Sequence, residues 1–174
     1  MNQTTKPLSP AGAFLVSRIK RGDKIPEVVL RRFFENKGAN PDDKMVVAEA
    51  YEIVGRFNEA GWSYGLLQIP DKVRDCKIKL AEWFEEQYWR SRQRGIDGSG
   101  LPLVIALRMY DELGMRERIT ACAGKLADNG EFFAAAEIFE AECLPQEAQR
   151  VRARAIEEIR NRINREQVKK SGVE

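Results

Sequence analysis

Histidine is absent from the sequence of 174 residues. Its absence excludes imidazole acid–base catalysis, serine or cysteine nucleophiles activated by histidine, and metal sites with histidine ligands. Cysteine is scarce, because only Cys76, Cys122 and Cys143 are present. They are widely spaced and include no C-x-x-C pair, so a cysteine-only zinc site lacks its fourth ligand. Each stands among apolar residues of an expected helix, which predicts three buried, unpaired thiols and fits a reducing cytoplasm.

Long hydrophobic runs are also missing, and nothing approaches the roughly 20 apolar residues of a membrane span. No early segment has the composition of a signal peptide. Phosphate-binding loops, dinucleotide-binding glycine motifs and calcium loops are absent from the sequence as well. Neighbouring acids, as in Asp42–Asp43 and Glu85–Glu86, diverge on a helix and supply no opposed acid and base. We therefore expect a soluble, cytoplasmic protein that is not an enzyme, with no cofactor and no metal.

Strand patterns are almost missing, since apolar and polar residues do not alternate over any sustained stretch. Apolar residues instead recur at spacings of three and four, and good helix formers dominate. The expected helices cover residues 9–21, 26–37, 42–60, 71–94, 102–113, 115–128 and 131–143, followed by a terminal helix from 145 to about 168. Residues 62–70 are ambiguous, because they are apolar but Gly65 and Pro70 interrupt them. The sequence thus predicts an all-α fold of antiparallel helix pairs, either an α-solenoid or an irregular helical bundle.

The glycine-rich stretch 95–100 is the expected hinge between domains. It separates an N-terminal helical region, residues 1–94, from helical hairpins with a long basic terminal helix, residues 101–174. One continuous domain is the alternative. The net charge is only +2, yet both ends and one arginine cluster are basic while the blocks between them are acidic. These blocks either attract each other within the fold or offer basic surfaces to anionic partners.

The second half is interrupted at regular intervals, at Gly114, Gly130 and Leu144–Pro145. Helices of this length joined by one tight turn must pack antiparallel, and a pair has the period of a helical solenoid. The stretch 119–145 carries small residues where helices cross, a glycine in the turn and large apolar residues one turn later. These are Ala123, Leu126, Gly130, Phe132, Ala135 and Phe139.

This stretch resembles a tetratricopeptide repeat. The resemblance implies stacked helical hairpins that present a surface to other proteins. The sequence departs from the family at Ile119, where tryptophan is frequent, at Glu142, where alanine is expected, and at Pro145, which comes early.

Two clusters are candidate partner-binding sites. The first combines Trp89 with Arg90, Arg92 and Arg94. Such residues stack on bases or anchor a peptide while pairing with its carboxylates. In the structural alternative Trp83, Phe84 and Tyr88 belong to the core and the arginines form a solvated helix end.

The second cluster lies on the terminal helix and includes Arg150, Arg154, Arg162 and Arg165. These arginines surround a narrow apolar stripe, which consists of Ala148, Val151, Ala155, Ile159 and Ile163. The pattern is typical of a docking helix, a coiled-coil seam or a basic arm. In the structural alternative the first half of the helix covers the preceding hairpin.

The sequence therefore favours a non-catalytic scaffold or adaptor whose partner is an acidic or amphipathic protein segment. The alternative is a nucleic-acid-binding protein, for RNA or DNA, that uses its basic terminal helices. Because a stripe-bearing tail exposes apolar side chains, a homodimer is a further expectation.

Overall fold

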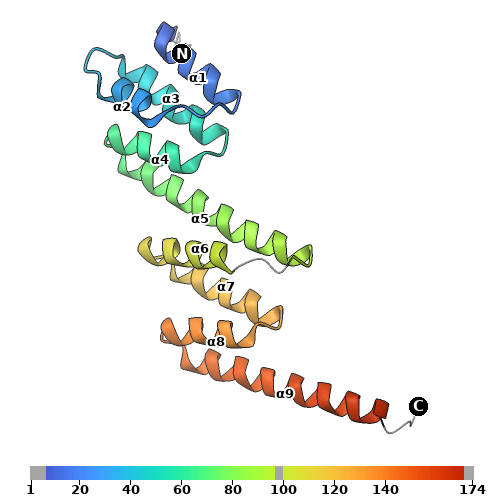
Figure 1. Ribbon diagram of the computed structural model, residues 1–174. Coiled ribbons are helices and arrows are strands. Elements are labelled where there is room, and N and C mark those ends of the chain that lie inside the picture. Colours follow the sequence, from blue (N-terminus) through green and yellow to red (C-terminus); the bar gives the residue numbers. More distant parts are fainter. Residues whose placement is uncertain (1–6, 97–99, 171–174) are drawn as a thin grey trace, which may run out of the picture. The chain divides into compact units, whose positions relative to one another are not determined.

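The computed structural model describes residues 7–96 and 100–170, and in these ranges the chain forms nine α-helices and no strand (Figure 1). The helices are α1 (Pro10–Lys20), α2 (Glu27–Glu35), α3 (Pro41–Ile53), α4 (Phe57–Leu66), α5 (Pro70–Gln93), α6 (Leu101–Glu112), α7 (Arg116–Asp128), α8 (Phe132–Ala141) and α9 (Pro145–Lys170). The predicted all-α fold is confirmed. Among the described residues, no helix combines the length and the apolar character needed to cross a membrane.

The structure corrects the helix predicted over residues 42–60, which is divided into α3 and α4. Gly55 lies between them with φ at +77°, a conformation that a side chain disfavours. The ambiguous stretch 62–70 belongs mostly to α4, which continues to Leu66. The hydrophobic spacing runs on through Phe57, and this continuity conceals the break in the sequence.

One type of turn ends helix after helix. At Gly55 the backbone N–H donates to the carbonyl of Glu52, 3.1 Å away, and the next N–H, of Arg56, donates to the carbonyl of Tyr51, 2.9 Å away. This pair of bonds is a Schellman motif, which satisfies carbonyls at the helix end. The seven residues with positive φ in the described part of the chain all occupy this position. They are Gly22, Gly55, Gln68, Gly95, Gly114, Gly130 and Cys143.

The chain divides into two compact units, Met1–Met109 and Tyr110–Glu174, so the division lies within α6. The hinge predicted at 95–100 includes residues 97–99, which lie outside the described residues. The domain boundary predicted there stays a prediction.

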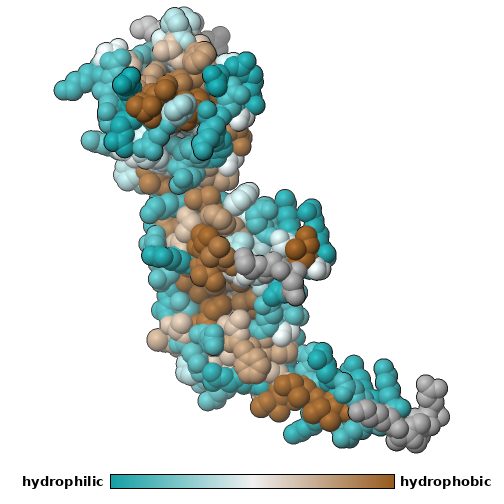
Figure 2. Space-filling view, viewed as in Figure 1, coloured by the Kyte–Doolittle hydropathy of each residue, from teal (hydrophilic) through white to brown (hydrophobic). Residues whose placement is uncertain are grey.

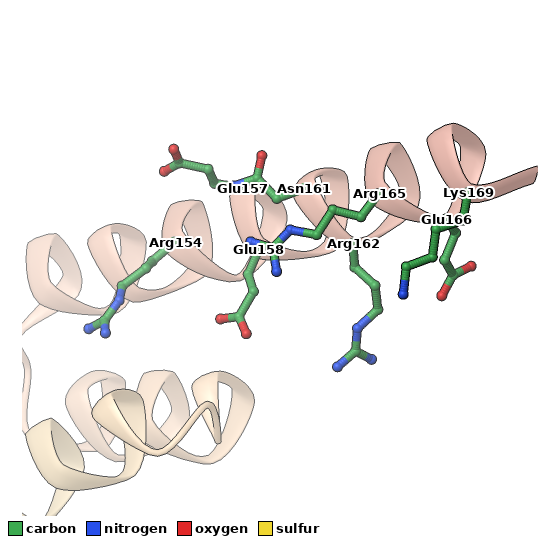
Figure 3. Close-up of a pocket in the computed structure, with 8 residues that line it drawn as sticks. All are labelled: Arg154, Glu157, Glu158, Asn161, Arg162, Arg165, Glu166 and Lys169. Atoms are coloured by element: carbon green, nitrogen blue, oxygen red, sulfur yellow. The ribbon is translucent and has the colours of Figure 1, made fainter. Parts of the chain in front are cut away.

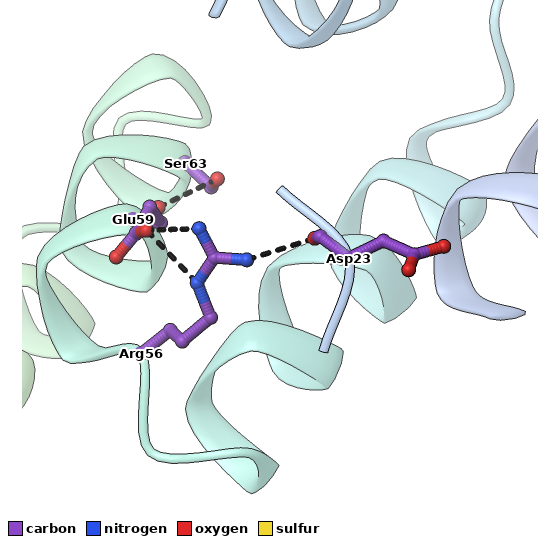
Figure 4. A network of polar contacts seen from close by, with 4 residues as sticks. All are labelled: Asp23, Arg56, Glu59 and Ser63. Atoms are coloured by element: carbon purple, nitrogen blue, oxygen red, sulfur yellow. Dashed lines mark hydrogen bonds and ion pairs between the residues drawn. The ribbon is translucent and has the colours of Figure 1, made fainter. Parts of the chain in front are cut away.

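In unit 1, α1 packs on α3, α3 on α4, and α4 on α5. The side chains of Ile19, Val47, Tyr51 and Tyr64 are fully buried in its core. Arg56 fixes the segment before α2 to the start of α4 (Figure 4). One of its terminal nitrogens donates to the carbonyl of Asp23, 3.0 Å away, while its other guanidinium nitrogens bind Glu59.

In unit 2, α8 lies between α7 and α9 and contacts both. Ala123, Leu126, Ala135 and Phe139 are buried in its core, as the tetratricopeptide pattern predicts. The predicted burial of the cysteines is confirmed for Cys76 and Cys122 but is wrong for Cys143, which is exposed. Cys143 follows α8 in the Schellman turn with φ at +59°, so it leaves the helix and its packed face.

The two units contain the same three-helix array. The bounds of α7 and α8 and the start of α9 follow those of α3, α4 and α5 at a constant distance of 75 residues. Burial corresponds as well. Ala48 and Ala123 are fully buried in α3 and α7, and Ala60 and Ala135 are fully buried in α4 and α8. The described chain therefore builds one helix–turn–helix–turn–helix unit twice.

Candidate interaction surface

The first predicted site lies at the end of α5, where Trp89 is half-buried. Its indole N–H donates to Glu85 Oε1, 3.3 Å away, and its ring packs edge-on against Tyr88 with centroids 4.8 Å apart. Glu85 and Tyr88 are themselves buried. The structure therefore ties Trp89 to two buried neighbours on its own helix.

The arginines of this cluster do not converge. Arg90 pairs with Glu86 at 2.6 Å. Arg92 donates to the hydroxyl of Tyr88, 3.3 Å away, and its guanidinium carbon lies 5.5 Å from the centre of that ring. Arg94 follows the helix and is exposed. The structure does not bring these side chains together into one anion-binding clamp, and their role in partner binding stays a prediction.

The exposed aromatic side chain of α5 is Trp83, of which 45% is accessible. The structural alternative for this cluster expected Trp83 in the core, because it follows the apolar spacing of the helix. Trp83 borders an open groove of about 560 Å³ between the α3–α4 turn and α5. The groove is lined by Val54, Gly55, Phe57, Lys79, Glu82, Trp83 and Glu86.

Next to this groove, Glu52 joins three helices of unit 1. Its carboxylate accepts a hydrogen bond from the hydroxyl of Tyr64 at 2.8 Å and forms ion pairs with Lys79 and Lys72. The hydrogen bond from Lys79 is the main cause that lowers the pKa of Glu52, and burial opposes it. Burial and the bond to Glu52 raise the pKa of Tyr64, which therefore stays a donor. These contacts fix the three helices to one another.

A smaller depression of about 310 Å³ lies beside α2 and α4. It is lined by Lys24, Ile25, Glu27, Leu30, Arg56, Asn58, Glu59 and Trp62. Because Arg56 is already bound by Glu59 and Asp23 (Figure 4), its charge is engaged within the fold.

The second predicted site is divided between two halves of α9. Arg150 pairs with Glu147 on its own helix at 2.8 Å. Arg154 pairs with Asp128 at the end of α7 at 3.0 Å, and its guanidinium carbon lies 5.7 Å from the centre of the Phe132 ring. Arg154 thus connects α9 to the preceding hairpin, as the structural alternative for this half expects.

Arg162 and Arg165 lie farther along α9, on an open face that α9 alone forms (Figure 3). All the side chains that line this face come from one helix, so it is a surface rather than a cavity. They are Arg154, Glu157, Glu158, Asn161, Arg162, Arg165, Glu166 and Lys169. Acids and bases are mixed on it, which makes it a weak attractor for either sign of charge.

A different face of α9 is apolar and bare. Ala148, Val151 and Ala155 are buried in the first half of the helix, and the stripe then continues into solvent. Ile156, Ile159 and Ile163 are 61%, 52% and 49% exposed. Figure 2 shows the apolar patch on the surface of α9. Ile159 and Ile163 belong to the stripe predicted from the sequence, whereas Ile156 was not part of that prediction.

The groove beside Trp83 and the open face of α9 occupy the same place in the two copies of the array. Lys79 Nζ lies 6.0 Å from the centre of the Phe57 ring, and Arg154 takes the corresponding position over Phe132. Glu82 and Trp83 correspond to Glu157 and Glu158. The two copies therefore share their framework and differ in the side chains that they present.

Comparisons with known proteins gave no match to a protein-family model, to a curated protein or to a solved structure. In the part of the chain that the structure describes, no three cysteine, aspartate or glutamate side chains gather as a metal site would require.

Proposed function

We propose that this protein is a non-catalytic scaffold or adaptor that binds other proteins through its helical array. The observation that carries the proposal is the bare stripe of Ile156, Ile159 and Ile163, which continues a buried stripe on the same helix. Large apolar side chains grouped on one surface mark sites of protein association. The first half of α9 packs on α8, and the exposed stripe continues the same helix.

Further support comes from the repeated array. Repeated helical units create extended surfaces, and differences between the copies decide what each surface binds. In this proposal the array is a divergent relative of tetratricopeptide repeats, and the protein acts in the cytoplasm. The association is of the helix-in-groove kind, in which apolar anchors are spaced three and four residues apart.

The experiment is affinity capture from native cells with three forms of the chain: wild type, Ile159→Asp, and the control Asn164→Asp. The control adds the same charge to the same helix, on an exposed residue outside the stripe. We expect wild type and Asn164→Asp to retain the same proteins after nuclease treatment, and Ile159→Asp to lose them.

Two outcomes contradict the proposal. If Ile159→Asp retains the same proteins as wild type, the stripe is not the binding surface. If nuclease removes the captured material, the basic helices bind nucleic acid, which was the alternative expected from the sequence.

A further inference from the structure

Comparison of the two copies of the array shows that the exposed apolar face of α9 corresponds to a buried face of α5. In α5 the positions equivalent to Ile156, Ile159 and Ile163 are Ala81, Phe84 and Tyr88. Ala81 is fully buried, Tyr88 is 4% exposed and Phe84 is half-buried. In the first copy this face of the helix is mostly buried. In the second copy the described chain leaves it open.

The residues beside the stripe indicate what would cover it. At 100° per residue, Arg160 lies on one side of the three isoleucines and Arg162 on the other. Both side chains are exposed. Glu157 lies on the far side of the helix, and Glu158 lies farther from the stripe than Arg162, on the open face that Arg162 also lines (Figure 3). The nearest acid along the stripe, Glu166, comes after the last isoleucine. Along the isoleucines themselves, the nearest charged side chain on each side is thus an arginine, and Glu166 follows beyond Ile163 on the side of Arg162.

We propose that this face binds an amphipathic helix of another protein, whose apolar stripe is bordered by glutamate or aspartate. The inference rests on the proposed function and names the chemistry of its partner. Leucine-sized side chains of the partner pack between Ile156, Ile159 and Ile163, as knobs pack into holes in a coiled coil. Its acidic borders pair with Arg160 and Arg162, and this pairing selects the partner rather than supplying most of the affinity.

A second copy of α9 fits this face poorly. In a coiled coil seamed by Ile156, Ile159 and Ile163, the residues that flank the seam decide which helices pair. On α9 these flanking positions hold Arg160, Arg162, Gln167 and Lys169, while the acid Glu166 falls at the next position of the seam itself. Neither a parallel nor an antiparallel pair of α9 helices therefore sets a carboxylate against the two arginines. Specificity against the second copy comes from this repulsion.

The test uses the full chain and two labelled synthetic helical peptides of about 20 residues, long enough to form a helix on binding. Both carry leucine along one stripe. One has glutamate on both borders of the stripe and the other has lysine. Fluorescence anisotropy measures their affinity for wild type, Ile159→Asp, the double variant Arg160→Glu/Arg162→Glu, and the control Asn161→Asp, which adds the same charge on the side of α9 opposite the isoleucines.

We expect wild type and the control to bind the glutamate peptide about tenfold more tightly than the lysine peptide, since two exposed charge contacts change sign. The double variant reverses the preference, and Ile159→Asp loses both peptides. Circular dichroism of each variant shows that it remains helical, so that a loss of binding reports on the surface.

Equal binding of the two peptides, preference for the lysine peptide or no binding by wild type overturns the inference. Sedimentation is the second measurement: a wild-type dimer that Ile159→Asp dissociates would make the second copy the occupant and would also overturn it. Capture of proteins that depends on Ile159, without preference for the glutamate peptide, would leave the scaffold proposal standing. Failure of both experiments contradicts both proposals.

Discussion

Glu52 is the residue on which the polar contacts of unit 1 converge, since Tyr64, Lys72 and Lys79 all bind its carboxylate. Its side chain is 14% exposed, so water replaces these contacts only in part. A carboxylate with a lowered pKa stabilises the folded state above its ordinary pKa, and this contribution is lost as the pH falls through the folded pKa.

We expect Glu52→Gln to lower the free energy of unfolding by about 1–2 kcal/mol at neutral pH, because charged hydrogen bonds are lost. The variant should also lose less stability than wild type between about pH 6 and pH 3, since the carboxylate that titrates there is gone. Urea denaturation across this range measures both effects. Glu49→Gln, an exposed change on the same helix, is the control. Parallel pH profiles of Glu52→Gln and wild type would contradict the account.

Gly55 and Gly124 differ in conformation, and their substitution by alanine should have opposite effects. Gly55 ends α3 with positive φ, so Gly55→Ala should destabilise the protein by about 1–2 kcal/mol. Gly124 lies within α7, where an added Cβ meets nothing within 4 Å, so Gly124→Ala should stabilise it by about 0.5–1 kcal/mol. Thermal unfolding compares the two. Stabilisation by Gly55→Ala would show that the turn does not have the conformation described.

The sequence did not predict how far individual side chains are exposed to solvent. Trp83 follows the helical spacing, yet 45% of it is accessible, because spacing defines a stripe but not how far neighbouring helices cover it. The predicted burial of Cys143 is wrong for a related reason. The break after α8 was expected at Leu144–Pro145, but the left-handed residue of the turn is Cys143 itself. The helix ends at Ala141, two residues before the predicted end, and the thiol of Cys143 is exposed.

At the scale of the element, the two halves of α9 differ in how far their apolar side chains are buried. Val151 is 7% exposed and packed, whereas Ile159 is 52% exposed. We expect Val151→Asp to lower the free energy of unfolding by more than about 2 kcal/mol, because it buries a charge without a partner. Ile159→Asp should change it by less than about 0.5 kcal/mol, since its site is open. Chemical denaturation of the two variants makes the comparison, and equal losses would place Ile159 within the fold.

Most helices were predictable, because apolar spacing, proline near the first turn and glycine after the last turn agree with one another. Pro10, Pro41, Pro70 and Pro145 all open helices in the structure. The exception is the pair α3 and α4, where Gly55 was read as part of one long helix. Only Val54, Gly55 and Arg56 separate α3 from α4, so the hydrophobic pattern passes over the break.

At the scale of the whole chain, the duplicated array was within reach of the sequence but was not recognised. Gly55, Phe57, Ala60 and Pro70 recur as Gly130, Phe132, Ala135 and Pro145. The signal was hidden because the remaining positions of the two copies differ. The sequence could not predict which apolar residues are exposed, since exposure depends on which helix faces other helices cover. The structure supplied that contrast between α5 and α9.

The most direct measurement is site-specific photocrosslinking in native cells, with benzoylphenylalanine at position 84 in one form of the chain and at position 159 in another. These are equivalent positions of the two copies, held by Phe84 and Ile159. The account predicts crosslinks within the chain from position 84 and crosslinks to another protein from position 159. Crosslinks from position 159 that stay within the chain, reach a second copy or reach nucleic acid would contradict it.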